Sequence, residues 1–212
     1  MKWLDDLKLF AKKPVDEISQ KMLHQWLKQS DLNNDKPLDH LVFDNFLSLN
    51  SVIRKAKKAK RQQFERFRDA YFRTDIQKKV FPKQSIINID FNLGKGVIAS
   101  ETILPNRYLG EYTGIVRRYL PNLDKSNQYL VKYPVKLNIF SSMVIDASKY
   151  GNHTRFYNHS SKPNAYLASV ICDGIFRMIA ISTSRIQNQS QILIDYGKLY
   201  WKQIGKTPND FF

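Results

Sequence analysis

The sequence predicts an α+β fold, in which a helical N-terminal subdomain precedes a mainly antiparallel β domain. Before residue 85, apolar residues recur at the spacing that is typical of amphipathic helices. After residue 85, short strand-like runs follow one another without a long intervening helix, which argues against a parallel, doubly wound sheet. We therefore expect a helical region at 1–85, a β domain at 86–201 and a C-terminal tail at 202–212.

The composition is that of a globular and strongly basic protein. The chain has 212 residues, 42% hydrophobic and 25% charged, with a formal net charge of +15, so it is long enough to bury a core and disorder is not expected. Cys172 is the single cysteine, which excludes an intramolecular disulfide and a cysteine-rich zinc site. No apolar run is long enough to span a bilayer, and the first ten residues lack the apolar core of a cleavable secretory signal. We expect a protein of an aqueous, reducing compartment without membrane contact.

Three helices are expected in the N-terminal region. Segments 3–12 and 15–29 show helical spacing, and Pro14 separates them. One long amphipathic helix is expected at 39–79, where no glycine or proline interrupts the pattern. Within it, the stretch from Arg54 to Arg73 holds nine basic residues against two acidic ones. This stretch is either a docking surface for nucleosomal DNA phosphates or a solvated helix face, and the sequence does not separate the two.

The β domain is expected to consist of short strands with turns between them. Alternating or continuous apolar runs bounded by turn residues indicate the strands. The expected strands are 86–91, 96–100, 107–114, 128–135, 143–146, 165–172, 175–182 and 191–195.

Three short clusters in this domain are weak signals when each is taken alone. Gly94, Lys95 and Gly96 precede a strand, and the two glycines permit positive φ and close approach to a ligand, although a plain tight turn explains them equally well. Residues 111–114 (EYTG) end an apolar strand, and residues 195–197 (DYG) end another. A turn after the strand and a buried tyrosine are the simple explanations of these two clusters.

The fourth cluster, residues 151–164 (GNHTRFYNHSSKPN), is the most specific. It is dense in hydrogen-bonding side chains and turn formers, with Phe156 and Tyr157 among them. A loop of this kind more often lines a site than decorates a surface. His153 and His159 have no carboxylate or thiol between them at ligand spacing, so we do not expect a metal.

In this order and spacing, the four clusters resemble the SET-domain protein lysine methyltransferases. The family pattern runs as a GxG turn, an EYxG segment, a strand with a tyrosine, an IDA segment, the run GNxxRFxNHSxxPN and a DYG. The corresponding residues here are 94–96, 111–114, Tyr129, 145–147, 151–164 and 195–197. The resemblance covers about residues 86–201 and leaves the helical N-terminal region outside.

A closer likeness is to the small SET proteins of chlamydiae, which are described as nuclear effectors delivered to host chromatin. It rests on GEYTG at 110–114, Arg117 with Arg118, YPV at 133–135, GIF at 174–176 and LYWK at 199–202. This likeness implies a protein of the bacterial cytoplasm that is secreted into a host cell and its nucleus.

The resemblance implies transfer of a methyl group from S-adenosylmethionine to a lysine Nε of a histone or another basic protein. By motif match, Tyr196 is the catalytic tyrosine and Tyr129 is the second tyrosine of the lysine channel. The residues that match the family's cofactor pocket are Gly94, Lys95, Gly96, Tyr112, Arg155, Asn158, His159 and Trp201. The family also threads its C-terminal segment through a loop near the NHS motif, which gives a knot-like arrangement and brings the third and fourth motifs together.

Several positions depart from the family pattern. Ser161 stands where many members have cysteine, and flanking cysteine-rich modules are missing, so zinc is not expected. Gln189 and Gln191 replace the usual Gly and Glu before the catalytic tyrosine, and Ile115 replaces a common second Glu. These changes leave open a second interpretation, in which the chain is a catalytically weak SET-like module that binds chromatin or nucleic acid. The target lysine, the number of methyl groups added and the oligomeric state are not indicated by the sequence.

Overall fold

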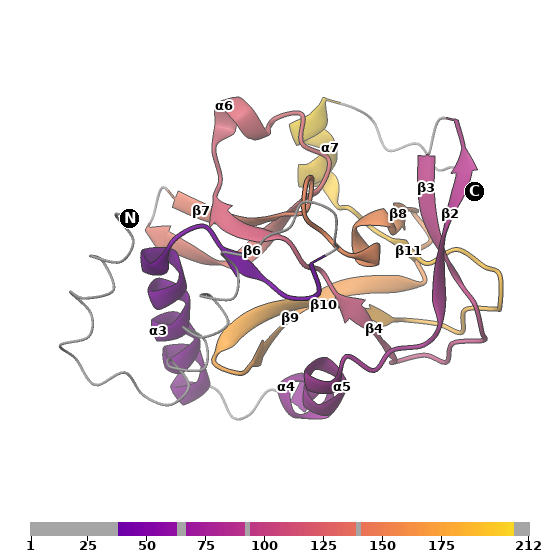
Figure 1. Ribbon diagram of the computed structural model, residues 1–212, viewed down its shortest axis with the longest axis horizontal. Helices are drawn as coiled ribbons and strands as arrows, with labels where there is room; N and C mark the ends of the chain where they lie inside the picture. The colour runs from indigo at the N-terminus through magenta and orange to yellow at the C-terminus, as the bar shows by residue number, and fades with distance from the viewer. Residues whose placement is uncertain (1–37, 63–66, 92–93, 139–140, 206–212) are drawn as a thin grey trace. The chain divides into compact units, whose positions relative to one another are not determined.

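The computed structural model describes residues 38–62, 67–91, 94–138 and 141–205 (Figure 1). The expected helices at 3–12 and 15–29 lie outside the described residues. The described chain is mostly β structure with a few short helices, arranged in three sheets. Among the described residues, no helix is long and apolar enough to cross a membrane.

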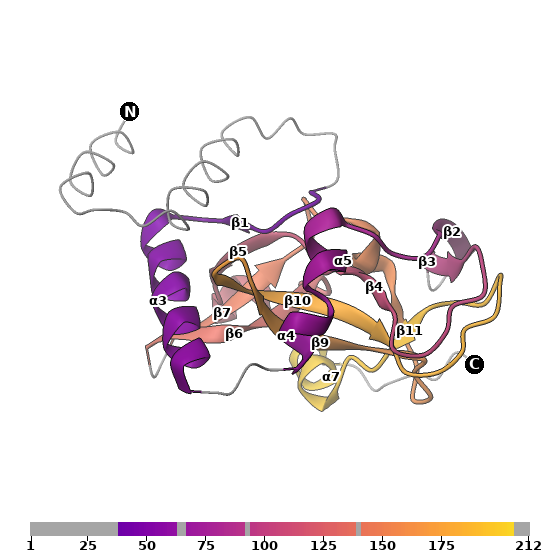
Figure 2. The same cartoon turned by 90° about the horizontal axis from the view of Figure 1, so that it is seen from below.

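Two sheets form the body of the domain, and the third is a two-stranded ribbon (Figures 1 and 2). The first sheet has the order β1 (Val42–Phe43), β5 (Ile115–Arg118), β7 (Ser141–Asp146) and β6 (Leu130–Asn138). The second has the order β4 (Tyr108–Glu111), β10 (Ile175–Ser182), β9 (Ala165–Cys172), β11 (Leu193–Ile194) and β8 (Asn158–His159). The ribbon pairs β2 (Gln84–Asp90) with β3 (Gly94–Ala99).

Most of the strand pairs are antiparallel, as the sequence predicts. The β9–β10 hairpin has the predicted bounds, and both residues of its turn, Asp173 and Gly174, have the positive φ that two-residue hairpins favour. Three pairs are parallel: β1 with β5, β8 with β11, and β9 with β11. Parallel pairs join segments that are distant in the sequence, so local patterns do not reveal them.

The prediction of one helix over 39–79 is wrong. The segment begins with β1, whose Val42 and Phe43 pair with β5, and continues as α3 (Phe46–Gln62), α4 (Phe67–Tyr71) and α5 (Arg73–Lys78). Asn45 caps α3, because its Oδ1 accepts a hydrogen bond of 2.8 Å from the backbone N–H of Ser48. Phe72 separates α4 from α5 with φ −94° and ψ 1°, a conformation outside the helical region. Two tertiary features therefore interrupt the helix that the periodicity predicts. They are the pairing of Val42 and Phe43 with β5 and the burial of Phe72.

The three helices pack on the strands through their apolar faces. Leu49, Val52, Ile53 and Ala56 of α3 are buried, and α3 contacts β6 and β10. In Figure 2, α4 and α5 lie along the five-stranded sheet, and they contact β9 and β4 respectively. The segment that follows β1 therefore shares its core with the strands that follow residue 85.

The C-terminal segment lies between two strands that precede it in the sequence. β11 pairs in parallel with β8 on one side and with β9 on the other. Asn164 fixes this arrangement, because its side chain donates to the carbonyl of Gln191 at 2.8 Å and accepts from the N–H of Leu193 at 2.9 Å. The chain then enters α7 (Lys198–Ile204), which crosses the expected boundary at residue 201. The knot-like threading stays a prediction.

Candidate active site

The centre of the candidate site lies where β8, β11 and the start of α7 meet. The parallel pairing of Ile194 with His159 places residues 195–197 beside 158–160. The backbone N–H of Tyr196 donates to Nδ1 of His159 at 3.2 Å, and the Tyr196 hydroxyl donates to the carbonyl oxygen of Tyr157 at 2.8 Å. Tyr196 is thus held at both its backbone and its hydroxyl, although its two anchors lie almost forty positions earlier in the chain.

The Tyr196 hydroxyl is a neutral group at physiological pH. Burial raises the pKa of Tyr196 well above its usual value, and the neighbouring Tyr200 and Tyr129 hydroxyls add to that increase. Because the proton of Tyr196 is donated to a main-chain carbonyl, the lone pairs of its oxygen remain available as hydrogen-bond acceptors. The geometry suits a residue that orients a substrate rather than one that removes a proton.

Three aromatic rings, those of His159, Tyr200 and Trp201, pack around Tyr196. The Tyr196 and Tyr200 ring centroids are 4.6 Å apart, and the Trp201 ring stacks on Tyr196 at 5.9 Å and meets His159 edge-on at 4.9 Å. Gly197, with φ 79°, turns the chain into α7 and so folds Tyr200 and Trp201 back onto Tyr196. Nε1 of Trp201 is buried and has no hydrogen-bond partner among the described residues, so it is an orphan donor that a bound ligand could satisfy.

Arg155 forms a second group with two aromatic rings. Its guanidinium carbon lies 5.0 Å from the centroid of Tyr129 and 4.6 Å from that of Phe156, within the range of cation–π contacts. Nη1 of Arg155 donates to the carbonyl oxygens of Ala147 at 2.7 Å and Ser148 at 3.1 Å. Nε of Arg155, in contrast, is buried and unpartnered within the described part of the chain. It is a second orphan donor that a bound ligand could satisfy.

The glycine turn lies beside Asn158. The Asn158 side chain donates to the carbonyl of Lys95 at 3.4 Å and to Oε1 of Gln191 at 3.2 Å. A Cβ on Gly96 would lie 2.9 Å from Nδ2 of Asn158 and 2.7 Å from the Ile89 side chain, so a larger residue there would force these side chains to move. Gln191, which departs from the family pattern, therefore contacts a predicted cofactor-binding residue.

Tyr112 connects the two tyrosines assigned to the lysine channel. Its hydroxyl donates to the carbonyl oxygen of Tyr129 at 3.0 Å. Burial raises the pKa of Tyr112, and negative charge on Tyr196 and Tyr129 would raise it further, as expected of neighbours. The structure thus brings Tyr112, Tyr129, Tyr196 and Arg155 into one region, while the roles assigned to them stay predictions.

A buried ion pair joins β4 to β10, and it was not predicted from the sequence. Glu111, the first residue of EYTG, accepts from Nη1 of Arg177 at 3.0 Å, and both side chains are buried. The carbonyl oxygen of Glu111 accepts from the Asn152 side chain at 2.8 Å and from the Thr154 hydroxyl at 3.3 Å, which ties β4 to the turn at 152–156. An arginine inside the apolar run at 175–182 was the available signal, because a charge on a buried strand requires a partner.

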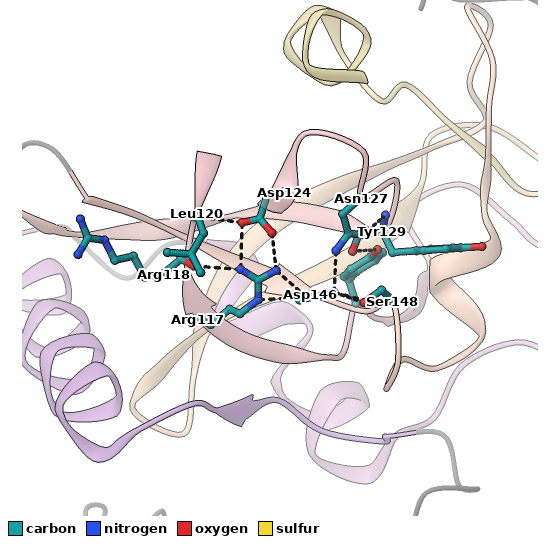
Figure 3. A network of polar contacts seen from close by, with 9 residues as sticks. Arg117, Arg118, Leu120, Asp124, Asn127, Tyr129, Asp146 and Ser148 are labelled. Atoms are coloured by element: carbon teal, nitrogen blue, oxygen red, sulfur yellow. Dashed lines mark hydrogen bonds and ion pairs between the residues drawn. The ribbon is translucent and has the colours of Figure 1, made fainter. Parts of the chain in front are cut away.

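A second polar network was also missed, and it is drawn in Figure 3. Arg117 of β5 bonds both Asp124 and Asp146, and Asp146 also accepts from Asn127. Asn127 in turn accepts from the backbone of Tyr129. In the sequence, Asp146 belongs to the 145–147 motif, whereas Arg117, Asp124 and Asn127 have no predicted role in the site.

Within the described ranges, no group of three or more His, Cys, Asp or Glu side chains is arranged to hold a metal ion. Cys172 is buried, and burial raises the pKa of its thiol to about 11. Nε2 of His153 contacts the carbonyl of Leu109 at 3.3 Å, whereas His159 contacts Tyr196. The two histidines therefore have separate surroundings, and the expected absence of zinc stays a prediction.

Comparison with known proteins identifies the class to which these motifs belong. Residues 94–197 match the family model described as SET domain. The chain is 29% identical over 127 residues to an H3 lysine-36 specific histone-lysine N-methyltransferase of Gibberella zeae, a match that covers 57% of this chain and 13% of the relative. It is 32% identical over 108 residues to histone-lysine N-methyltransferase set-2 of Caenorhabditis elegans, covering 49% of this chain and 7% of the relative. A putative histone-lysine N-methyltransferase of Plasmodium falciparum is 28% identical over 207 residues, covering 91% of this chain and 3% of the relative. The chain thus spans only a small part of the length of these curated relatives.

Proposed function

We propose that this chain, a SET-domain protein related to histone-lysine N-methyltransferases, transfers a methyl group from S-adenosylmethionine to the Nε of a protein lysine. The single observation that supports this most strongly is the anchoring of Tyr196. Its backbone is held by His159 and its neutral hydroxyl by the Tyr157 carbonyl, and the ring of Trp201 stacks on its own ring. A protein that only binds chromatin has no chemical need for that combination.

S-adenosylmethionine supplies an electrophilic methyl group on a sulfonium. The residues that fit it here are the turn at 94–96, Tyr112, Arg155, the 158–159 pair and Trp201. The fit rests on two orphan donors, Nε of Arg155 and Nε1 of Trp201, and on Gly94, whose positive φ and open surroundings would let the backbone approach a ligand closely.

Tyr196 and Tyr129 act on the lysine by orienting it. A lysine amine attacks only when it is neutral, and its free pKa is about 10.4. Desolvation among aromatic rings lowers that pKa, because the charged form loses its hydration. The oxygen of Tyr196, whose proton is donated to the Tyr157 carbonyl, is free to accept a hydrogen bond from the amine and so to align the nitrogen lone pair.

The test is transfer of labelled methyl groups by the purified protein and by Tyr196→Phe. Core histones, nucleosomes and bacterial basic proteins are offered in separate reactions, and the label is located by mass spectrometry. Tyr166→Phe, which removes a hydroxyl from an exposed position on β9, is the matched control. Label on lysines that depends on Tyr196 but not on Tyr166 supports the proposal. No transfer, combined with no stabilisation by S-adenosylmethionine in thermal unfolding, would favour the chromatin-binding module instead.

The substrate that we propose is a histone or a histone-like basic protein. The names of the relatives support this choice, whereas the net charge of +15 opposes it because a basic tail is repelled. The repulsion is offset if the protein first docks on DNA. In α3, exposed Arg54 and Lys58 lie on the face opposite the buried apolar residues, where they are placed to contact phosphates.

The docking is tested by charge reversal on α3. Arg54→Glu/Lys58→Glu should weaken binding to nucleosomal DNA and reduce its salt dependence, while methylation of a free peptide is unchanged. Lys83→Glu/Arg185→Glu, at two other exposed positions, reverses the same amount of charge as a control. Equal weakening by both pairs would mean that only the overall charge matters and that the α3 face is a solvated helix face.

We also propose, from the likeness to the chlamydial proteins, that the protein is a bacterial effector that acts on host chromatin. The shared segments at 110–118, 133–135, 174–176 and 199–202 support this proposal. Antibody staining and fractionation of infected cells test it, with a cytoplasmic bacterial protein as the control. Retention of the protein inside the bacteria would redirect the search to a bacterial histone-like substrate.

A further inference from the structure

We propose that Asn127 is a positioning residue for Tyr129, and that the carboxylate of Asp146, held by Arg117, keeps Asn127 in place. The proposal rests on the proposed function in one respect, namely that Tyr129 lines the lysine channel. None of the three residues contacts the reacting groups on this assignment. They would act on methyl transfer only through the position of the Tyr129 ring.

Asp146 is the last residue of β7 and contacts the strands on both sides of it. β7 is the central strand between β5 and β6, and Asp146 pairs with Ile115 on one side and with Leu130 on the other. Its Oδ2 accepts from Nε and Nη2 of Arg117 at 3.0 and 2.7 Å, on β5. Its Oδ1 accepts from Nδ2 of Asn127 at 3.1 Å, just before β6. One carboxylate therefore bridges the two ends of the segment 119–129 (Figure 3).

Asp124, which lies within the same segment, also binds Arg117. Its two carboxylate oxygens accept from Nη2 and Nη1 of Arg117 at 2.6 and 2.9 Å, and its side chain is 2% exposed. It also accepts from the backbone N–H of Leu120 at 2.7 Å, which holds the short helix α6 (Pro121–Asp124). Arg117 is thus bound by the buried carboxylate of Asp124 and by the half-buried carboxylate of Asp146, and the segment cannot swing outward unless these charge-assisted bonds break.

The backbone of Tyr129 is fixed on both sides by this arrangement. Its N–H donates to Oδ1 of Asn127 at 3.0 Å, an interaction two residues apart that is typical of an Asx-turn. Its carbonyl accepts from the N–H of Ala147 at 3.1 Å and from the hydroxyl of Tyr112 at 3.0 Å. A backbone held at both groups fixes the direction of the Cα–Cβ bond. The ring then meets Phe156 edge-on at 6.5 Å between centroids.

Asn127 is the most direct point at which to break the arrangement. It joins the Asp146 carboxylate to the N–H of Tyr129, since its amide donates to one and its carbonyl oxygen accepts from the other. Asn127→Ala removes both bonds without introducing a charge. Asn122→Ala is the matched control, because Asn122 is the same residue type in the same segment and is exposed.

The first readout is the position of the Tyr129 ring itself, which does not require activity. In protein with ring-¹³C tyrosine, the Tyr129 resonance is assigned by its loss in Tyr129→Phe. Asn127→Ala should shift this resonance toward that of free tyrosine, because the ring leaves its place beside Phe156, and Asn122→Ala should leave it unchanged. An unmoved resonance in Asn127→Ala, or an equal shift in both variants, would overturn the proposal.

The second readout separates positioning from a general loss of structure. Asn127→Ala should lower kcat by roughly 10- to 100-fold with little change in S-adenosylmethionine affinity, since a misplacement of about 1 Å can cost that much. In a Tyr129→Phe background, the same substitution should cost far less, because placing the ring serves mainly to place the hydroxyl that this background lacks. Additive losses would contradict the proposal.

A conservative variant covers the case in which Asn127→Ala does not fold. Asn127→Ser keeps an oxygen that can accept from the Tyr129 N–H, although more weakly, and should give an intermediate shift of the resonance and an intermediate kcat. If the wild-type protein transfers no methyl groups while the Tyr129 resonance still responds to Asn127→Ala, the proposed function fails and the positioning role stands. If transfer is normal in Asn127→Ala and the resonance is unmoved, the positioning role fails alone.

Discussion

The ion pair between Glu111 and Arg177 should be the most sensitive point of the β domain to a single substitution. Nη1 of Arg177 lies 3.0 Å from Oε2 of Glu111, and the side chains are 9% and 7% exposed. Oε1 of Glu111 has no hydrogen-bond partner among the described residues. Burial raises the pKa of Glu111, and Arg177 opposes that increase. Arg177→Met keeps most of the side-chain volume and leaves the carboxylate without its nearest positive charge.

The expected loss follows from the burial of both groups. Removing one partner of a buried ion pair costs about 3–5 kcal/mol in the free energy of unfolding. For a chain of this length, that corresponds to a fall of roughly 6–20 °C in Tm. The magnitude should depend on pH, because Glu111 can lose its unpaired charge by binding a proton.

The sign of the pH dependence is set by the raised pKa. Burial already raises the pKa of Glu111 in the wild type, and loss of Arg177, which lowers that pKa, should raise it further in the variant. Between the wild-type and variant values, the folded variant binds more protons than the folded wild type. The stability of Arg177→Met relative to the wild type should therefore decrease as pH rises, by at most about 1.4 kcal/mol per pH unit. The variant should be less impaired at pH 5 than at pH 7.

The assay is urea-induced unfolding followed by circular dichroism at pH 5 and pH 7. Arg185→Met, which removes an exposed arginine, is the control and should change stability little. Glu111→Leu/Arg177→Met, which removes both charges, should recover much of the loss. A cost below about 1 kcal/mol at pH 7, or an equal cost at both pH values, would refute the reasoning that the pair is buried and coupled.

Three further predictions concern the site and the strands beside it. Tyr196→Phe should lower kcat by roughly 100-fold or more. Because burial holds the pKa of Tyr196 far above neutral, the rise of kcat/KM with pH should keep its shape in the variant. A changed pH profile would assign proton transfer to the hydroxyl. Burial raises the pKa of Asp146, but hydrogen bonds from Ser148 and Arg117 outweigh it and hold the pKa below 3.8. The stability that this lowered pKa provides is present above pH 3.8 and is lost as pH falls through the pKa of the folded state. Asp146→Asn should therefore unfold less steeply in an acid titration followed by circular dichroism. Gly114→Ala should destabilise by about 1–3 kcal/mol in urea, because its Cβ would lie 2.5 Å from the carbonyl oxygen of Asp146, and an unchanged midpoint would contradict this contact.

Local patterns in the sequence were sufficient for most of the antiparallel strands, although β5, which pairs antiparallel with β7, was not among those predicted. The β9–β10 hairpin was predicted with its bounds, because its apolar runs and the Asp173-Gly174 turn lie within one short stretch of chain. The helical pattern at 39–79 was equally clear, yet Val42 and Phe43 form a strand with residues more than seventy positions away. A local pattern carries no information about such a partner, so tertiary pairing decided this segment.

The sequence by itself determined which class of site the chain carries. The motifs at 94–96, 111–114, 151–164 and 195–197 predict a SET domain from residue types and spacing, and the match over 94–197 confirms it. Only the tertiary structure decided how these residues are held. The ion pair of Arg177 with Glu111 spans 66 positions, and Asp146 joins Arg117 to Asn127 across a central strand. Charged groups that are shielded from solvent require partners, but the sequence does not indicate which residues those partners are. The orphan donors of Arg155 and Trp201 likewise become visible only when the surrounding side chains are in place.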